Sequence, residues 1–174
     1  MRQVIPQDGI VCLDNGMYKI WFARNYRTQV ANTLLLDNAL ATMGAELPSA
    51  MIAAMLYPSR RVRRRRLHAV RLRLDLVVLI LQDNAYPMIR WKQAVDGFPD
   101  FGLRFGNPDF VLYAKAYGVN GSRVESADGL APALEAAFAG GGVHLVSAPV
   151  YYLENIRVLV DELRTYAPMS AVRK

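Results

Sequence analysis

The chain has 174 residues and a net charge of +6, and 53% of its residues are hydrophobic. This length and composition predict one globular domain with a sizeable core. Cys12 is the only cysteine, which excludes an intrachain disulfide and a metal site built from cysteines. The continuous apolar run at residues 76–81 is too short to span a bilayer, and the first residues lack the apolar core of a signal peptide. We therefore expect a cytoplasmic protein without a membrane anchor.

The first half of the chain alternates between strand-like and helix-like segments. Residues 10–13 and 34–36 are short and apolar, and each predicts a strand that stops at an Asp-Asn pair. Residues 48–57 are rich in alanine and methionine and predict a buried helix with Pro48 in its first turn. Residues 76–81 (LVVLIL) are continuously apolar, which is typical of a strand that is covered on both faces.

The second half of the chain continues this alternation. Residues 91–107 are rich in glycine and proline and predict a long mobile loop. Asn107-Pro108 then predicts the capped start of a helix over 108–117 that ends at Gly118. The remaining predicted elements are a strand at 122–125, a helix at 128–139, a strand at 143–146 and a helix at 155–163. This order favours an α/β fold with a doubly wound, mostly parallel sheet flanked by helices.

Polar residues follow three of the predicted strands at the point where each strand ends. They are Asp14-Asn15, Asp37-Asn38 and Asp83-Asn84. Ligands of doubly wound sheets bind beyond the carboxyl ends of the strands. Each pair taken alone favours a turn, because Asp and Asn suit turns. Several such pairs at one edge strengthen the case for a ligand site.

Six arginines fill residues 60–66, and without them the net charge would be zero (6 − 6 = 0). The basic character is therefore local. Arginine runs bind phosphates without sequence specificity, so nucleic-acid binding is one hypothesis. No recognised nucleic-acid motif and no interleaved aromatic residue accompanies this run, which argues against a specific nucleic-acid partner.

Four stretches of the sequence form a specific combination, although each alone is weak. They are LDNALATMGAELPSAM (36–51), LRLDLVVLILQDNAYPMIRWKQ (72–93), FGNPDFVLYAKAYGVNGSRVES (105–126) and GGVHLVSAPVYYLENI (141–156). The combination resembles the C-terminal, thiamine-diphosphate-binding domain of acetolactate synthase large subunits, and the catabolic-type branch most. The resemblance covers about residues 1–165, which we expect to form a single domain followed by a tail at 166–174. It implies thiamine diphosphate and Mg²⁺ as cofactors and pyruvate, a 2-oxo acid, as substrate.

The resemblance also implies which residues hold these groups. The Asp83 carboxylate and the Ala85 carbonyl match metal ligands, and hard oxygens of this kind suit Mg²⁺. The positions that match the cofactor-binding segments are Gly16, Met17, Tyr18, Ala41, Met43, Gly44, Asn84, Tyr86 and Met88. Met43 taken alone would favour core packing over a cofactor contact, and both interpretations remain open.

The first metal ligand of the family is missing from this sequence. The family carries it in a Gly-Asp-Gly motif, whereas this chain has Asp8-Gly9, Asp96-Gly97 and Asp128-Gly129 but no Gly-Asp-Gly. Residues 60–70, with the arginine run, stand where the motif and its strand are expected. Consecutive arginines cannot lie inside a parallel sheet without a severe desolvation cost. We therefore expect a deletion scar at 60–70, a truncated central strand–helix unit, and a gap or an unpaired edge in the sheet.

Other departures from the family pattern point the same way. Glu46 adds a carboxylate where the family has a small residue, and Pro87 removes an amide donor after the metal loop. Tyr151 and Leu153 replace a polar pair. The family's activating glutamate comes from an N-terminal domain, usually of the partner subunit, so we expect no catalytic residue within this chain.

Two hypotheses for the function therefore remain beside nucleic-acid binding. The first is a domain of an acetolactate-synthase-like enzyme that is incomplete and inactive on its own. The second is a non-catalytic dimerisation or regulatory module that pairs with itself or with a full-length relative.

Overall fold

The computed structural model describes residues 2–57, 69–72, 74–152 and 155. They divide into two compact units, one of Met1–Gln82 with Asn107–Pro149 and one of Asp83–Gly106 with Val150–Lys174. The arginine run, the tail at 166–174 and all but Asn155 of the predicted last helix lie outside the described residues. The domain boundary at residue 165 stays a prediction. In the described part of the chain, no helix has the length and hydrophobicity needed to cross a membrane.

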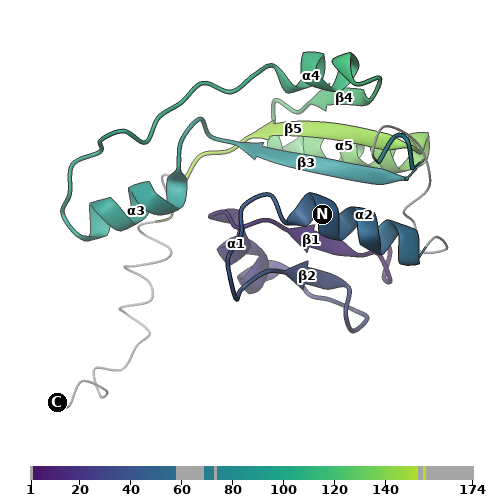
Figure 1. The fold of residues 1–174 in the computed structure, drawn as a ribbon, viewed down its shortest axis with the longest axis horizontal. Helices are drawn as coiled ribbons and strands as arrows, with labels where there is room; N and C mark the ends of the chain where they lie inside the picture. The colour runs from purple at the N-terminus through teal and green to yellow at the C-terminus, as the bar shows by residue number, and fades with distance from the viewer. Residues whose placement is uncertain (1, 58–68, 73, 153–154, 156–174) are drawn as a thin grey trace. The chain divides into compact units, whose positions relative to one another are not determined.

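All described strands belong to the first unit and pair in parallel (Figure 1). Strand β1 (Val11–Leu13) pairs with β2 (Leu34–Leu36) in one sheet. A second sheet has the order β3 (Leu76–Gln82), β5 (Val143–Pro149), β4 (Asn120–Arg123). The predicted α/β fold with parallel strands and flanking helices is confirmed, and the described strands form two sheets. The expected truncation at 60–70 falls mostly outside the described residues and stays a prediction.

The sequence missed two of the five described helices. These two are α1 (Tyr18–Asn25) and α3 (Pro87–Val95). Helix α1 carries few strong helix formers, and its aromatic residues at Tyr18 and Phe22 pack against the β1–β2 core. Helix α3 replaces the first part of the predicted mobile loop at 91–107. Pro87 stands at its start, where a missing amide hydrogen costs nothing.

The bounds of the other helices agree with the sequence to within a few residues, but the helix predicted as buried over 48–57 buries only Ala53 and Ala54 among its side chains and exposes the rest in part or in full. These other helices are α2 (Glu46–Leu56), α4 (Phe110–Ala116) and α5 (Ala127–Gly140). The predicted cap of α4 at Asn107 is wrong. Asp109 caps this helix, and its carboxylate accepts hydrogen bonds from the amides of Val111 (2.8 Å) and Leu112 (3.0 Å). A carboxylate in this position satisfies two amides that the first helical turn leaves without partners.

The described residues form two buried hydrophobic clusters, and one partly buried residue packs against both. Leu134 and Val146 are almost fully buried in the cluster between α5 and the larger sheet. Val11 and Leu13 lie in the cluster beneath α1. Phe138 of α5 packs against both clusters, and α2 packs against both β1 and β3. The two sheets therefore lie side by side within the first unit.

Strand β3 differs from its prediction as a strand covered on both faces. All seven of its residues are half-buried, whereas residues 145–148 of β5 are buried. The reason is position in the sheet. Strand β5 lies between two neighbours, and β3 pairs with β5 alone among the described strands.

Candidate cofactor site

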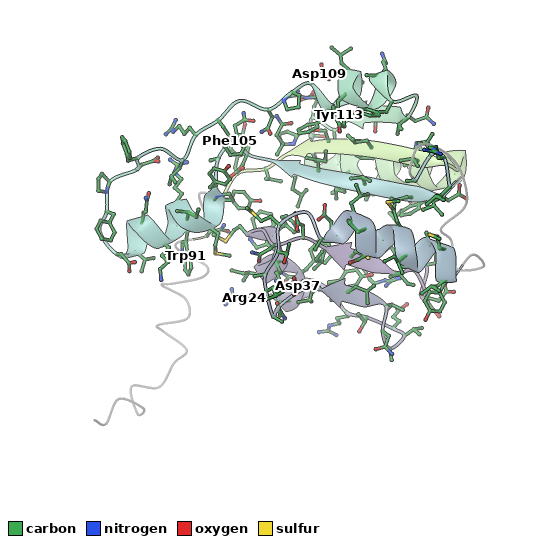
Figure 2. All side chains as sticks on the ribbon, in the orientation of Figure 1. Arg24, Asp37, Trp91, Phe105, Asp109 and Tyr113 are labelled. Carbon is green, nitrogen blue, oxygen red and sulfur yellow. The ribbon has the colours of Figure 1, made fainter. Side chains whose placement is uncertain are left out.

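The Asp37 carboxylate is engaged by its own loop at the end of β2 (Figure 2). It accepts hydrogen bonds from the amides of Ala39 (3.1 Å), Leu40 (3.3 Å) and Thr42 (3.2 Å). These bonds, led by that of Thr42, hold the pKa of Asp37 below its usual range. The turn interpretation of Asp37-Asn38 is confirmed, and this carboxylate is committed to the loop.

The loop after β2 is fastened to the end of β1 by three side chains. The Asn15 amide donates to the Ala41 carbonyl (2.8 Å), and the Gly44 amide donates to the Asp14 carboxylate (2.8 Å). Lys19 donates to the Asp37 carbonyl (2.8 Å). We name residues 37–45 the presenting loop. The sequence singled out Asn15 through its strand-end Asp-Asn pair, whereas no pattern signalled Lys19.

The presenting loop holds its backbone in an unusual conformation. Ala41 has φ of +51° and Gly44 has φ of +84°. Glycine adopts such angles freely, whereas alanine there costs about 1–2 kcal/mol. Between them, Met43 is 69% exposed. This exposure contradicts core packing of Met43, and its contact with a cofactor stays a prediction.

The second predicted segment, Gly16 to Tyr18, lies beside this loop because Asn15 and Asp14 precede it. Met17 is 1% exposed, and Tyr18 packs in the β1–β2 core. A side chain on Gly16 would lie 2.5 Å from the Tyr18 ring. The Met17 side chain is therefore committed to the core, whereas the Tyr18 side chain packs there and stays partly exposed.

Two further ionisable groups lie near the end of β1. Burial, and then the negative charge of Asp14, raises the pKa of the Glu46 carboxyl. Burial, and then Glu46, raises the pKa of the Cys12 thiol to about 11. The Cys12 thiol is therefore protonated at neutral pH and is a poor nucleophile. A deprotonated Glu46 would repel an anionic ligand such as a diphosphate.

The other predicted residues belong to the second unit, in a loop closed at its base. The Tyr86 amide donates to the Leu103 carbonyl (3.0 Å), and the Phe105 amide donates to the Asn84 carbonyl (3.1 Å). The Tyr86 and Phe105 rings lie 4.9 Å apart between centroids. Asp100 adds an ion pair with Arg90 (3.0 Å). Figure 2 labels Phe105 at this base.

Asp83 opens this loop and is partly buried. Its carboxylate accepts a hydrogen bond from the Ala85 amide (3.2 Å), and Asn84 between them has φ of +57°. Burial raises the pKa of Asp83. Burial, and then the charge of Asp83, raises the pKa of Tyr152 above its usual range, so this phenol lies near the carboxylate. The sequence did not single out Tyr152. Tyr86 and Met88 are partly exposed beside the loop base.

These residues match only part of a magnesium site. Mg²⁺ prefers six oxygen ligands in an octahedron. Asp83 offers one carboxylate and Ala85 one carbonyl. Across the described ranges, no three acidic, histidine or cysteine side chains gather as a metal-binding group. The remaining ligands would have to come from a bound diphosphate and from water.

A model of one protein family matches most of the chain. The family model described as "Thiamine pyrophosphate enzyme, C-terminal TPP binding domain" matches residues 14–63 and 66–148. The unmatched residues 64 and 65 lie inside the arginine run.

Similar proteins include acetolactate synthases. The chain is 30% identical to "Acetolactate synthase" of Bacillus subtilis (strain 168), over 94% of the chain and 31% of that protein. It is 32% identical to "Acetolactate synthase, catabolic" of Raoultella terrigena, over 89% of the chain and 30% of that protein. It is 27% identical to "Acetolactate synthase isozyme 2 large subunit" of Escherichia coli (strain K12), over 89% of the chain and 31% of that protein. The chain thus spans about a third of the length of these relatives.

Proposed function

The chain belongs to the family of C-terminal TPP-binding domains of thiamine pyrophosphate enzymes, and on this premise we propose that it is a weakened cofactor-binding domain. In this proposal, residues 1–174 by themselves do not convert pyruvate. Thiamine diphosphate, when bound, supplies the carbanion chemistry of such enzymes, and the protein positions it. The presenting loop would contact the cofactor through Met43, and Asp83 with the Ala85 carbonyl would hold Mg²⁺.

The observation that carries this proposal is the shortage of free carboxylates. The Asp14 and Asp37 carboxylates accept backbone amides of the presenting loop, so each is committed to structure. Asp83, the third strand-end carboxylate, also accepts a backbone amide, that of Ala85 (3.2 Å), and its other oxygen is the one that this proposal assigns to the metal. A single carboxylate and a carbonyl support a metal–diphosphate bridge poorly, so we expect weak binding that depends little on Mg²⁺.

Calorimetric titration of the 174-residue chain with thiamine diphosphate tests this proposal. We would titrate with and without Mg²⁺, at low and at physiological salt, and use Asp83→Asn as the matched variant. We expect weak binding that Mg²⁺ and the variant change little. Micromolar binding that requires Mg²⁺ and is lost in Asp83→Asn would contradict the weakened site. No binding under any condition would contradict cofactor binding altogether.

A pairing module is the second candidate, and exposed apolar side chains on α2 favour it. Ile52, Met55 and Leu56 are each more than half exposed. Scattered apolar residues are normal on a surface, but several on one helix indicate an interaction. Sedimentation of the chain, alone and mixed with a full-length acetolactate synthase, tests this candidate. A monomer in both conditions would exclude it.

A further inference from the structure

Two carboxyl groups lie where β1, the presenting loop and α2 meet. Asp14 directly follows β1, and its carboxylate accepts a hydrogen bond from the Gly44 amide at 2.8 Å. Glu46 is the first residue of α2, two positions after Gly44, and its carboxyl group hydrogen-bonds to that of Asp14. A carboxylate offers only acceptors, so two carboxyl groups can bond to each other only when one of them carries a proton.

The burial of Glu46 also favours a proton at this place. Its Oε2 atom is buried, and no donor among the described residues reaches it. The amides of Glu46 and Leu47 at the start of α2 hydrogen-bond to the carboxyl group and favour its charged form, but burial outweighs them and raises the pKa of Glu46. A proton on Glu46 turns a buried acceptor without a partner into a donor toward Asp14.

The attachment of Gly44 depends on Asp14 rather than on packing. Gly44 has φ of +84°, and a Cβ added there would meet no described atom within 4 Å. The bond from its amide to the Asp14 carboxylate therefore holds this end of the presenting loop against β1. A hydrogen bond to a charged acceptor is stronger than one between neutral groups.

We propose that Asp14 and Glu46 share one proton, and that the shared proton fastens the end of the presenting loop to β1. We name this pair of residues the proton latch. Loss of the proton to water leaves two half-buried carboxylates beside each other, and like charges in such a place repel strongly. Because Gly44 and Glu46 lie in one short segment, separation of the two carboxylates draws the Gly44 amide away from Asp14.

The other titratable and charged groups around α2 do not replace the proton. Helix α2 packs against β1, β2 and β3, and the strands β2 and β3 carry no charged residue. On β1, the Cys12 thiol has a raised pKa and is neutral. The Asp37 carboxylate accepts amides of its own loop, and Lys19 donates to the Asp37 carbonyl at 2.8 Å. No ion pair of the described residues includes a member of the proton latch.

The direction of the pH dependence separates the proton latch from Asp37. The pKa of Glu46 is raised, so the latch holds below the ordinary carboxyl pKa and is lost as pH rises through the raised value. The pKa of Asp37 is lowered, so its bonds to the loop amides are lost as pH falls through the lowered value. If the presenting loop contacts the cofactor, the affinity for thiamine diphosphate falls as the latch opens. That consequence alone rests on the proposed function.

Amide hydrogen exchange of the unliganded 174-residue chain tests the proton latch without any cofactor. The readout is the protection factor of the Gly44 amide, which corrects the exchange rate for the intrinsic effect of pH. We would measure it from below the ordinary carboxyl pKa to above neutral pH. We expect it to fall at least about tenfold as pH rises, the change for one lost hydrogen bond to a charged group. In nuclear magnetic resonance spectra, the carboxyl carbon of Glu46 should titrate with the same midpoint.

Two isosteric variants and one control identify the groups that share the proton. Glu46→Gln places a permanent donor where the proton would be, so Gly44 should stay protected across the whole pH range. Asp14→Asn removes the repelling charge and keeps an oxygen acceptor, so the pH dependence should vanish there too. Glu135→Gln, at an exposed position of α5, is the matched control and should behave as the unaltered chain does.

Three results would overturn the proposal. A constant protection factor in the unaltered chain would mean that no proton holds the loop. A fall that persists in Glu46→Gln and Asp14→Asn would assign the effect to another group. A protection factor that rises with pH would mean that Asp37 governs the loop instead. Because no cofactor enters the experiment, each of these results bears on the proton latch and not on the proposed function.

Discussion

Removal of the Asn15 side chain should loosen the presenting loop without unfolding the protein. In the structure the Asn15 amide group donates to the Ala41 carbonyl at 2.8 Å. Such a bond contributes about 1 kcal/mol net, and Ala41 in its left-handed conformation stores about 1–2 kcal/mol of strain. Without the bond, the strain favours release of the loop. We expect Asn15→Ala to raise the open population of the loop about fivefold, which is the factor for about 1 kcal/mol.

Amide hydrogen exchange reads this change directly. The Gly44 and Thr42 amides donate to Asp14 and Asp37, so both should exchange about fivefold faster in Asn15→Ala. Asn25→Ala is the matched control, because Asn25 makes an equivalent amide-to-carbonyl bond to Trp21 (3.0 Å) within α1. Unchanged exchange at Gly44 and Thr42 in Asn15→Ala would refute the anchoring role. The same acceleration in Asn25→Ala would show a general loss of stability instead.

Three further predictions concern the stability of the first unit. Asp109→Ala should lower the free energy of unfolding by about 1 kcal/mol, measured in urea, because it removes the cap of α4; Asp109→Asn should retain most of it, and equal losses would contradict capping. Gly121→Ala should lower the free energy of unfolding in urea by about 1–3 kcal/mol, because the new Cβ would lie 2.8 Å from the Ala114 Cβ and 3.0 Å from the Val111 Cα. An unchanged midpoint of urea unfolding would show that α4 shifts without cost. Burial raises the pKa of Glu46 in the folded state, so the folded state binds the proton more tightly than the unfolded state does. The stability of the protein should therefore fall as pH rises above the ordinary carboxyl pKa. Glu46→Gln should remove this fall in melting temperature across pH, and an unchanged fall would assign the effect to another group.

The strand ends show why a sequence predicts the place of a site better than its chemistry. Asp14, Asp37 and Asp83 each follow a strand, and the structure confirms these positions. Asp37 and Asp83 accept amides from residues within five positions, and local sequence predicts such turns. Asp14 accepts the amide of Gly44, thirty positions away, and local sequence contains no sign of that partner, so its commitment to the presenting loop could not be predicted.

The helices also differ in how well local sequence predicts them. The helices α2 and α5 are rich in alanine and leucine, and local propensity was enough to find them. Helix α1 has no such propensity and forms because its partly buried aromatic side chains pack against β1 and β2. Tertiary burial can override local preference, and this happens only after the chain has folded.

The sequence by itself determined the α/β class, the order of most elements and the local character of the positive charge, and the family followed from its resemblance to known sequences. The class and the order of elements follow from short-range patterns of apolar, capping and turn residues, which act within a few positions of the chain. Only the tertiary structure decided that the described strands form two sheets, that β3 pairs with β5 alone among them and that Met43 is exposed in the presenting loop. Those properties depend on contacts between residues far apart in the chain, whose energies exist only when the elements are packed together.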